Sequence, residues 1–184
     1  GPIDHALVEL VERIGKRLFA ERLVGASFGN MSVRTGSGFF ITRNGSYLDC
    51  PGSLVFVPLA GKVPPDASSE YRVHRAVYRA TDCQAIIHAH PPFAIARSLL
   101  CDQIVPVDSQ GLMFAPLIPV IEGPCGSDDL ASQVACGLAA YSIVVARGHG
   151  TFAAGKSLEE AYLLTSLAEH SCRVLFLAES AKGR

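Results

Sequence analysis

Two histidines stand at the end of an apolar run, in the stretch Ala85-Ile86-Ile87-His88-Ala89-His90-Pro91-Pro92. The isoleucines favour a buried strand, and the two prolines end it. Alternate side chains of a strand share one face, so His88 and His90 point the same way. Two such imidazoles can bind one divalent cation, although the same pair could also be polar residues that leave a sheet for solvent.

A third histidine follows a second apolar run. His149 comes shortly after Ser142–Ala146 and lies between Gly148 and Gly150, which let backbone or a ligand approach closely. If both runs are buried strands, the three imidazoles lie at strand ends, where a cleft would open. Three neutral imidazoles with an open fourth position are the ligand set of a catalytic zinc site.

Glu70 begins a predicted helix behind two serines. The positive end of the helix dipole stabilises a carboxylate there, and a carboxylate beside a dication can act as a ligand or as a proton carrier. An ordinary first-turn glutamate is the alternative. His74, one turn later, is placed to support Glu70, whereas His5 and His170 are expected on helical surfaces.

Small hydrogen-bond donors recur in three pairs along the chain. Glycine exposes its backbone N–H, asparagine and serine add side-chain donors, and a helix start directs its dipole at an anion. Together the pairs could hold a phosphate, while each pair alone could equally serve in a turn or a helix cap. The pairs are Gly29-Asn30, Asn44-Gly45 and Ser68-Ser69.

Composition limits the remaining possibilities. A chain of 184 residues suits a single domain, 1–184, with a substantial core. The formal charge of −1, with scattered Lys and Arg, indicates no nucleic-acid or anionic-membrane partner. No apolar run reaches the roughly 20 residues of a membrane span, and no signal peptide is visible. The six cysteines show no CxxC spacing, so reduced, mostly buried thiols and a cytoplasmic location are expected.

Hydrophobic periodicity predicts more strands than helices, with several strands paired as hairpins. We therefore expect an α/β fold in three layers, α/β/α, with a mixed, largely antiparallel central sheet. Serines are the expected N-caps of the second helix and of the helices that begin at Ser127 and Ser157, and Gly25 is expected to stop the first helix. The expected helices run over about 4–23, 70–81, 92–100, 127–139 and 157–180, and the strands over about 26–34, 38–42, 54–59, 85–90, 104–107, 117–121, 142–146 and 151–154.

Five motifs in this order resemble the class II aldolase/adducin family over nearly the whole chain. The family patterns are S-x-G-N-x-S-x-R, I-T-x-x-G, S-S-E, H-x-H-P and H-G. Here they read Ser27–Arg34, Ile41–Gly45, Ser68-Ser69-Glu70, His88–Pro91 and His149-Gly150.

The resemblance implies one zinc ion per subunit on His88, His90 and His149. Glu70 would be the acid/base and the resting fourth ligand. The substrate phosphate would bind Gly29, Asn30, Asn44, Gly45, Ser68 and Ser69. The implied enzyme is a homotetrameric zinc-dependent aldolase with active sites at subunit interfaces. It would cleave a ketose phosphate such as L-fuculose 1-phosphate, through a metal-stabilised enediolate, into dihydroxyacetone phosphate and an aldehyde.

Two departures from the family's aldolases keep other activities open. Arg43 and Asn44 stand where these aldolases usually have proline and then threonine or serine, and the extra charge could favour a phosphate or a carboxylate. The tyrosine that a neighbouring subunit contributes in these aldolases has no evident match around residues 108–112. A metal-dependent decarboxylase, epimerase or dehydratase remains an alternative. A non-catalytic, adducin-like interaction domain ranks lower, because such domains lack the metal histidines.

Overall fold

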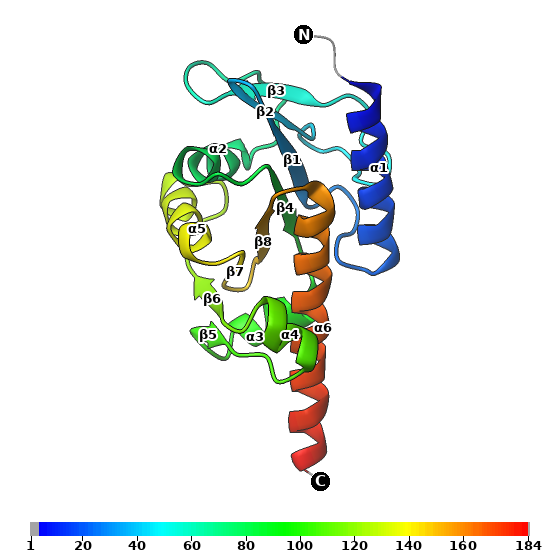
Figure 1. The fold of residues 1–184 in the computed structure, drawn as a ribbon, viewed down its shortest axis with the longest axis vertical. Coiled ribbons are helices and arrows are strands. Elements are labelled where there is room, and N and C mark those ends of the chain that lie inside the picture. The colour runs from blue at the N-terminus through cyan, green and yellow to red at the C-terminus, as the bar shows by residue number, and fades with distance from the viewer. Residues whose placement is uncertain (1–3, 184) are drawn as a thin grey trace.

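The computed structural model describes residues 4–183, so residues 1–3 and 184 of the predicted domain lie outside it. Figure 1 shows the course of the chain. No helix in this part of the chain is both long and apolar enough to cross a membrane. The elements are α1 (His5–Ala20), β1 (Asn30–Thr35), β2 (Gly38–Ile41), β3 (Val55–Pro58), α2 (Tyr71–Ala80), β4 (Ala85–Ala89), α3 (Pro92–Ser98), β5 (Gln103–Ile104), α4 (Ser109–Phe114), β6 (Ile118–Ile121), α5 (Asp128–Ala140), β7 (Ile143–Ala146), β8 (Gly150–Gly155) and α6 (Leu158–Lys182).

The eight strands form one mixed sheet in the order β3-β2-β1-β4-β8-β7-β6-β5. β6 and β7 run parallel, and the other neighbouring pairs in the described chain are antiparallel. Helices α2 and α5 lie together against one face, and α1 and α6 lie on the other (Figure 1). The predicted fold class, a mixed and largely antiparallel sheet between two helical layers, is confirmed.

Two hydrophobic cores lie on opposite faces of this sheet, and β4 contributes to both. Ile87 belongs to the same core as Ile14 of α1, while Ile86 belongs to the other core with Val73 of α2. A central strand that is buried on both faces needs a continuous apolar run, as the sequence of β4 has. His88 follows Ile86 on the α2 side, which is the face on which Glu70 lies.

The predicted serine caps are right for two helices and wrong for one. Ser127 and Ser157 accept the backbone N–H groups of Leu130 and Glu160, so α5 and α6 begin where expected. At α2, Glu70 itself occupies the N-cap position and its side chain makes no cap hydrogen bond. The Glu70 carboxylate is therefore available for other contacts.

Three further predictions differ from the structure. α1 ends at Ala20, before Gly25, because Arg22 turns the chain with φ 60°. The first strand begins only at Asn30, since Gly29 adopts φ 84°. Of the predicted strand 104–107, only Ile104 lies in a strand, the two-residue β5. The helix α4 follows, and Asp108 caps it by accepting the Gly111 N–H at 3.1 Å. A helix of six residues is too short for its periodicity to appear in the sequence.

The cysteines are free, as expected, but their predicted burial is mostly wrong. Cys172 is buried, whereas Cys50, Cys125 and Cys136 are exposed. Cys125 lies in the cleft described below.

Candidate active site

The ten residues that the sequence motifs single out line one cleft of about 130 Å³. The cleft lies where β4 and β7 end and α2 begins. The structure thus brings all ten together, while their individual roles stay predictions. The lining comprises Gly29, Asn30, Asn44, Gly45, Ser68, Ser69, Glu70, His88, His90 and His149, together with Ser27, Phe28, Arg43 and Cys125.

The three histidines come from two elements that the sheet holds side by side. β4 pairs with β8, whose Thr151 lies opposite Ala89, so the β7–β8 turn lies beside the end of β4. His149 in that turn donates its backbone N–H to Ala146 at 2.9 Å. One ring nitrogen of each histidine lies within 4.8 Å of a ring nitrogen of the other two.

The tautomer of His88 is fixed by the neighbouring strand. Its Nδ1 donates to the carbonyl oxygen of Thr151 at 2.9 Å, so Nε2 carries the free lone pair. Burial lowers the pKa of His88 far below its ordinary value, and burial beside His149 lowers the pKa of His90 to about 4. Both rings are therefore neutral at pH 7. Their Nε2 atoms lie 3.0 Å apart, close to the roughly 3.3 Å between two imidazole ligands of one tetrahedral zinc ion.

Glu70 adds a carboxylate to this group. Glu70 is 4% exposed, and its Oε1 atom lies 4.0 Å from His149 Nε2. Glu70 Oε2 and His149 Nδ1 are buried without a hydrogen-bond partner among the residues that the structure describes. Buried polar atoms without a hydrogen-bond partner are costly. Three imidazoles and a carboxylate around them fit a divalent ion of the zinc type.

His74 is a buried link in a hydrogen-bond chain rather than a support for Glu70, so that prediction was wrong. Tyr78 Oη lies 2.7 Å from Ser32 Oγ, Ser32 Oγ lies 2.6 Å from His74 Nδ1, and His74 Nε2 lies 2.5 Å from Asn30 Oδ1. Burial lowers the pKa of His74 to about 3, so the ring is neutral and carries one proton. Because Asn30 Oδ1 can only accept, His74 Nε2 donates to it, and Ser32 donates to His74 Nδ1. This chain turns the Asn30 amide NH₂ away from His74.

The predicted phosphate-binding residues lie on three loops held against one another. Gly29 adopts a positive φ, and a Cβ at this position would lie 2.9 Å from the carbonyl oxygen of His88, so only glycine fits. The loop at Asn44 is joined to the start of α2 by a bridge between Arg43 and Ala67. Ser68 is buried and Ser69 is exposed at that helix start.

The sequence prediction did not assign Ser27, Phe28 and Cys125 to the cleft. Phe28 lies inside the first motif, and its ring stacks on His90 at 5.9 Å between centroids. Cys125 follows the predicted strand 117–121 and comes just before the Ser127 cap, a position at a strand end that could have marked it. Partial burial of its sulfur and the neighbouring Glu70 carboxylate raise the pKa of the Cys125 thiol to about 11.

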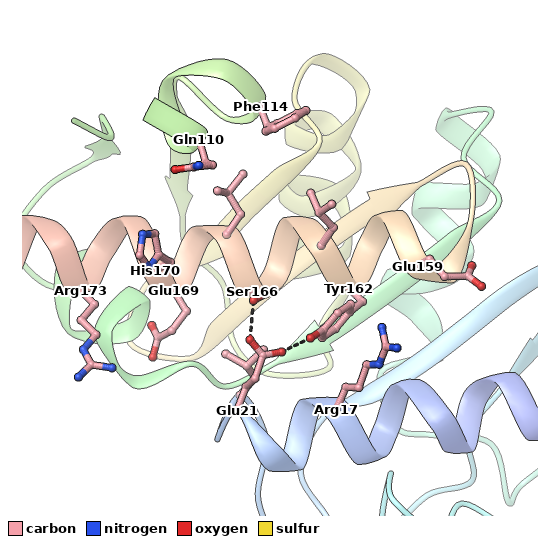
Figure 2. A pocket seen from close by; sticks show the side chains of 13 residues that line it. Arg17, Glu21, Gln110, Phe114, Glu159, Tyr162, Ser166, Glu169, His170 and Arg173 are labelled. Atoms are coloured by element: carbon pink, nitrogen blue, oxygen red, sulfur yellow. Dashed lines mark hydrogen bonds between the residues drawn. The ribbon is translucent and has the colours of Figure 1, made fainter. Parts of the chain in front are cut away.

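A larger hollow of about 830 Å³ lies between α1, α4 and α6 (Figure 2). Its residues include His170, which is exposed on α6 as expected, but none of the ten site residues. Glu21, at the end of α1, accepts hydrogen bonds from Tyr162 and Ser166 of α6, so these polar groups already have hydrogen-bond partners (Figure 2). The groups suited to catalysis gather in the smaller cleft instead.

A three-layer α/β fold that brings three histidines and a buried carboxylate together at the ends of its central strands defines a protein of the class II aldolase type. The family model described as Class II Aldolase and Adducin N-terminal domain matches residues 9–176, and the chain belongs to this family.

Relatives with assigned activities agree with this membership. The crystal structure of L-fuculose-1-phosphate aldolase from Thermus thermophilus is 35% identical, covers 95% of each chain and superposes with a TM-score of 0.92. L-fuculose phosphate aldolase of Methanococcus maripaludis strain C7 is 28% identical over 90% of this chain and 93% of its own length. A protein of Nocardia farcinica, assigned as a bifunctional methylthioribose-1-phosphate isomerase/methylthioribulose-1-phosphate dehydratase, is 32% identical over 65% of this chain and 22% of its own length.

Proposed function

We propose that this protein is a zinc-dependent aldolase that cleaves a ketose phosphate, such as L-fuculose 1-phosphate, into dihydroxyacetone phosphate and an aldehyde. The observation that carries the proposal is the convergence of His88, His90, His149 and Glu70 in one cleft with three loops suited to a phosphate. The assigned activities of the Thermus and Methanococcus relatives support the same reaction.

In this proposal His88, His90 and His149 hold the ion and Glu70 moves the proton. A bound divalent ion supplies Lewis-acid polarisation of the substrate's carbonyl oxygen, an effect of several kcal/mol. After the carbon–carbon bond breaks, Glu70 returns a proton to the carbon atom of the dihydroxyacetone phosphate half. Its Oε2 atom, which lacks a partner within the described chain, is available to carry that proton.

The remaining cleft residues bind and orient the phosphate. The His74 contact leaves the Asn30 NH₂ group as a fixed donor, and Ser69 adds a hydroxyl at the start of α2. Asn44, Gly45, Ser68 and Gly29 complete the proposed phosphate site. Donors that are held in place lose little freedom when the substrate binds.

A second candidate is a dehydratase or decarboxylase that acts on a sugar phosphate at the same metal site. The dehydratase assignment of the Nocardia relative favours the first, and Arg43 favours the second, because it lines the cleft and could hold a substrate carboxylate. An epimerase belongs to the same group of alternatives. The fold alone does not separate these reactions.

We further propose a homotetramer with active sites at subunit interfaces, located in the cytoplasm. Large apolar side chains are exposed on α4 and on the end of α6, which runs past the body of the molecule (Figure 1). Burial against another subunit would cover them. These side chains are Leu112, Met113, Phe114, Phe176 and Leu177. The six free thiols suit a reducing compartment.

The experiment compares the products formed from a panel of ketose phosphates and keto-acid phosphates, with aldehyde and CO₂ measured side by side. We expect aldehyde and dihydroxyacetone phosphate, with little change in Arg43→Ala. Formation of CO₂ or a dehydrated product without aldehyde would overturn the aldolase proposal, and CO₂ release that collapses in Arg43→Ala would establish the decarboxylase.

A Glu70→Gln variant isolates the proton step. It keeps the three imidazoles and should keep its metal, yet lose proton transfer by roughly 10²–10⁴-fold. The measurement is solvent-deuterium exchange into dihydroxyacetone phosphate, with metal content as the control. Undiminished exchange in a metal-loaded variant would exclude Glu70 as the proton carrier.

A further inference from the structure

The Cys125 thiol lies directly against two of the proposed metal ligands. Its Sγ atom is 3.0 Å from Glu70 Oε1 and 3.8 Å from His149 Nε2. These three donor atoms all lie within 4.8 Å of one another. His149 therefore belongs both to the group of three histidines and to a second group with a carboxylate and a sulfur.

The loop that carries Cys125 is held in place by the sheet and by the start of α5. β6 and β7 are parallel, with Ile121 opposite Ala146, so the segments that carry Cys125 and His149 leave the same edge of the sheet. The Ser127 hydroxyl and N–H both donate to the Pro124 carbonyl oxygen, at 2.6 and 3.1 Å. Gly126 adopts φ 69°, which glycine tolerates, and completes the turn around the cysteine.

Buried atoms beside the sulfur are left without partners. Glu70 is only 4% exposed, and its Oε2 atom has no hydrogen-bond partner in the described chain. His149 Nδ1 is likewise buried and unpartnered there. A sulfur and an imidazole nitrogen on one tetrahedral zinc ion lie about 3.6 Å apart, close to the 3.8 Å observed here.

We infer that Cys125 is a ligand of the metal site, which binds the ion through Sγ beside His149 and competes with Glu70 for the position that the three histidines leave open. The inference rests on the proposed metal site and adds a soft donor to it. The sulfur binds as the thiolate, and the thiol proton passes to solvent when the ion binds. Because thiolates favour soft ions, Cys125 directs the site towards zinc, cobalt or cadmium rather than magnesium or manganese.

The first test replaces the native ion with Co²⁺ and records the absorption spectrum. Thiolate ligation gives a sulfur-to-cobalt charge-transfer band in the near ultraviolet, separate from the visible bands that cobalt shows with any ligand set. We expect both sets of bands in the native protein and in Cys136→Ser, a matched variant at an exposed cysteine of α5. Cys125→Ser should keep the visible bands and lose the near-ultraviolet band.

The outcomes separate this inference from the proposed function. Visible cobalt bands without the sulfur band in the native protein, or a sulfur band that persists in Cys125→Ser, would overturn the role of Cys125 and leave the histidine site standing. Absence of all cobalt bands would overturn both.

Two further measurements keep the inference testable if Cys125→Ser folds poorly. X-ray absorption of the native zinc protein should show a zinc–sulfur distance of about 2.3 Å, and a fit with nitrogen and oxygen alone would contradict the inference. Loss of even an indirect partner of a metal lowers affinity roughly 10–100-fold. Cys125→Ser should therefore weaken Cd²⁺ binding by at least tenfold while Mn²⁺ binding changes little. Equal losses for both ions would refute the sulfur contact.

Discussion

Ser32→Ala should destabilise the protein strongly, because one hydroxyl holds two other buried groups. Ser32 Oγ lies 2.6 Å from His74 Nδ1 and 2.7 Å from Tyr78 Oη, and these three residues are at most 2% exposed. The substitution leaves a ring nitrogen and a phenol without partners. Each unsatisfied buried group costs about 1–3 kcal/mol, so the free energy of unfolding should fall by about 2–6 kcal/mol. That is a large part of a typical stability of about 5–15 kcal/mol.

Urea unfolding of the metal-free protein measures this loss without a contribution from ion binding. Tyr78→Phe removes one hydrogen bond and leaves Ser32 with His74, so its loss should be smaller, about 0.5–1.5 kcal/mol. Ser132→Ala, at an exposed position of α5, is the matched serine control and should stay within about 0.5 kcal/mol of the native protein. A Ser32→Ala loss no larger than that of Ser132→Ala would refute the hydrogen-bond chain.

Two further predictions concern pH and the phosphate site. Burial keeps His74 neutral in the folded protein and lowers its pKa to about 3, whereas the pKa of the unfolded ring is about 6.5. The free energy of unfolding therefore falls as the pH drops below 6.5, because the unfolded state binds a proton that the folded state does not. Between pH 7 and 5.5 this histidine alone should remove about 1 kcal/mol from the free energy of unfolding, measured in the presence of a chelator. Equal urea midpoints at both pH values would contradict its burial. Asn30→Ala and Ser69→Ala should each weaken binding of phosphorylated substrates by roughly 1.5–3 kcal/mol and leave non-phosphorylated analogues nearly unchanged, as measured by KM. Equal losses for both substrate types would mean that these residues only shape the loops.

Local chemistry allowed most of the site to be located from the sequence. The prolines after His90 end β4, and the two-residue period places His88 and His90 on one face. Helix starts were read correctly where a serine caps the chain, as at Ser127 and Ser157.

Contacts between distant segments explain what could not be predicted. Cys125 lies beside His149 because β6 and β7 pair in parallel. No pattern in the sequence around either residue predicts that pairing. His74 looked like a partner of Glu70 because one helical turn separates them. Its ring instead meets Asn30 and Ser32, which β1 brings under α2. Tertiary packing, rather than spacing along the helix, decides which neighbour a buried histidine takes.

Metal content measured on purified protein tests the central claim, that three histidines bind a divalent ion, most directly. The native protein and His170→Ala, a control on the exposed face of α6, should each bind about one ion per subunit, zinc by preference. His88→Ala, His90→Ala and His149→Ala should each lose most of it. Full occupancy in any of these three variants would contradict the account.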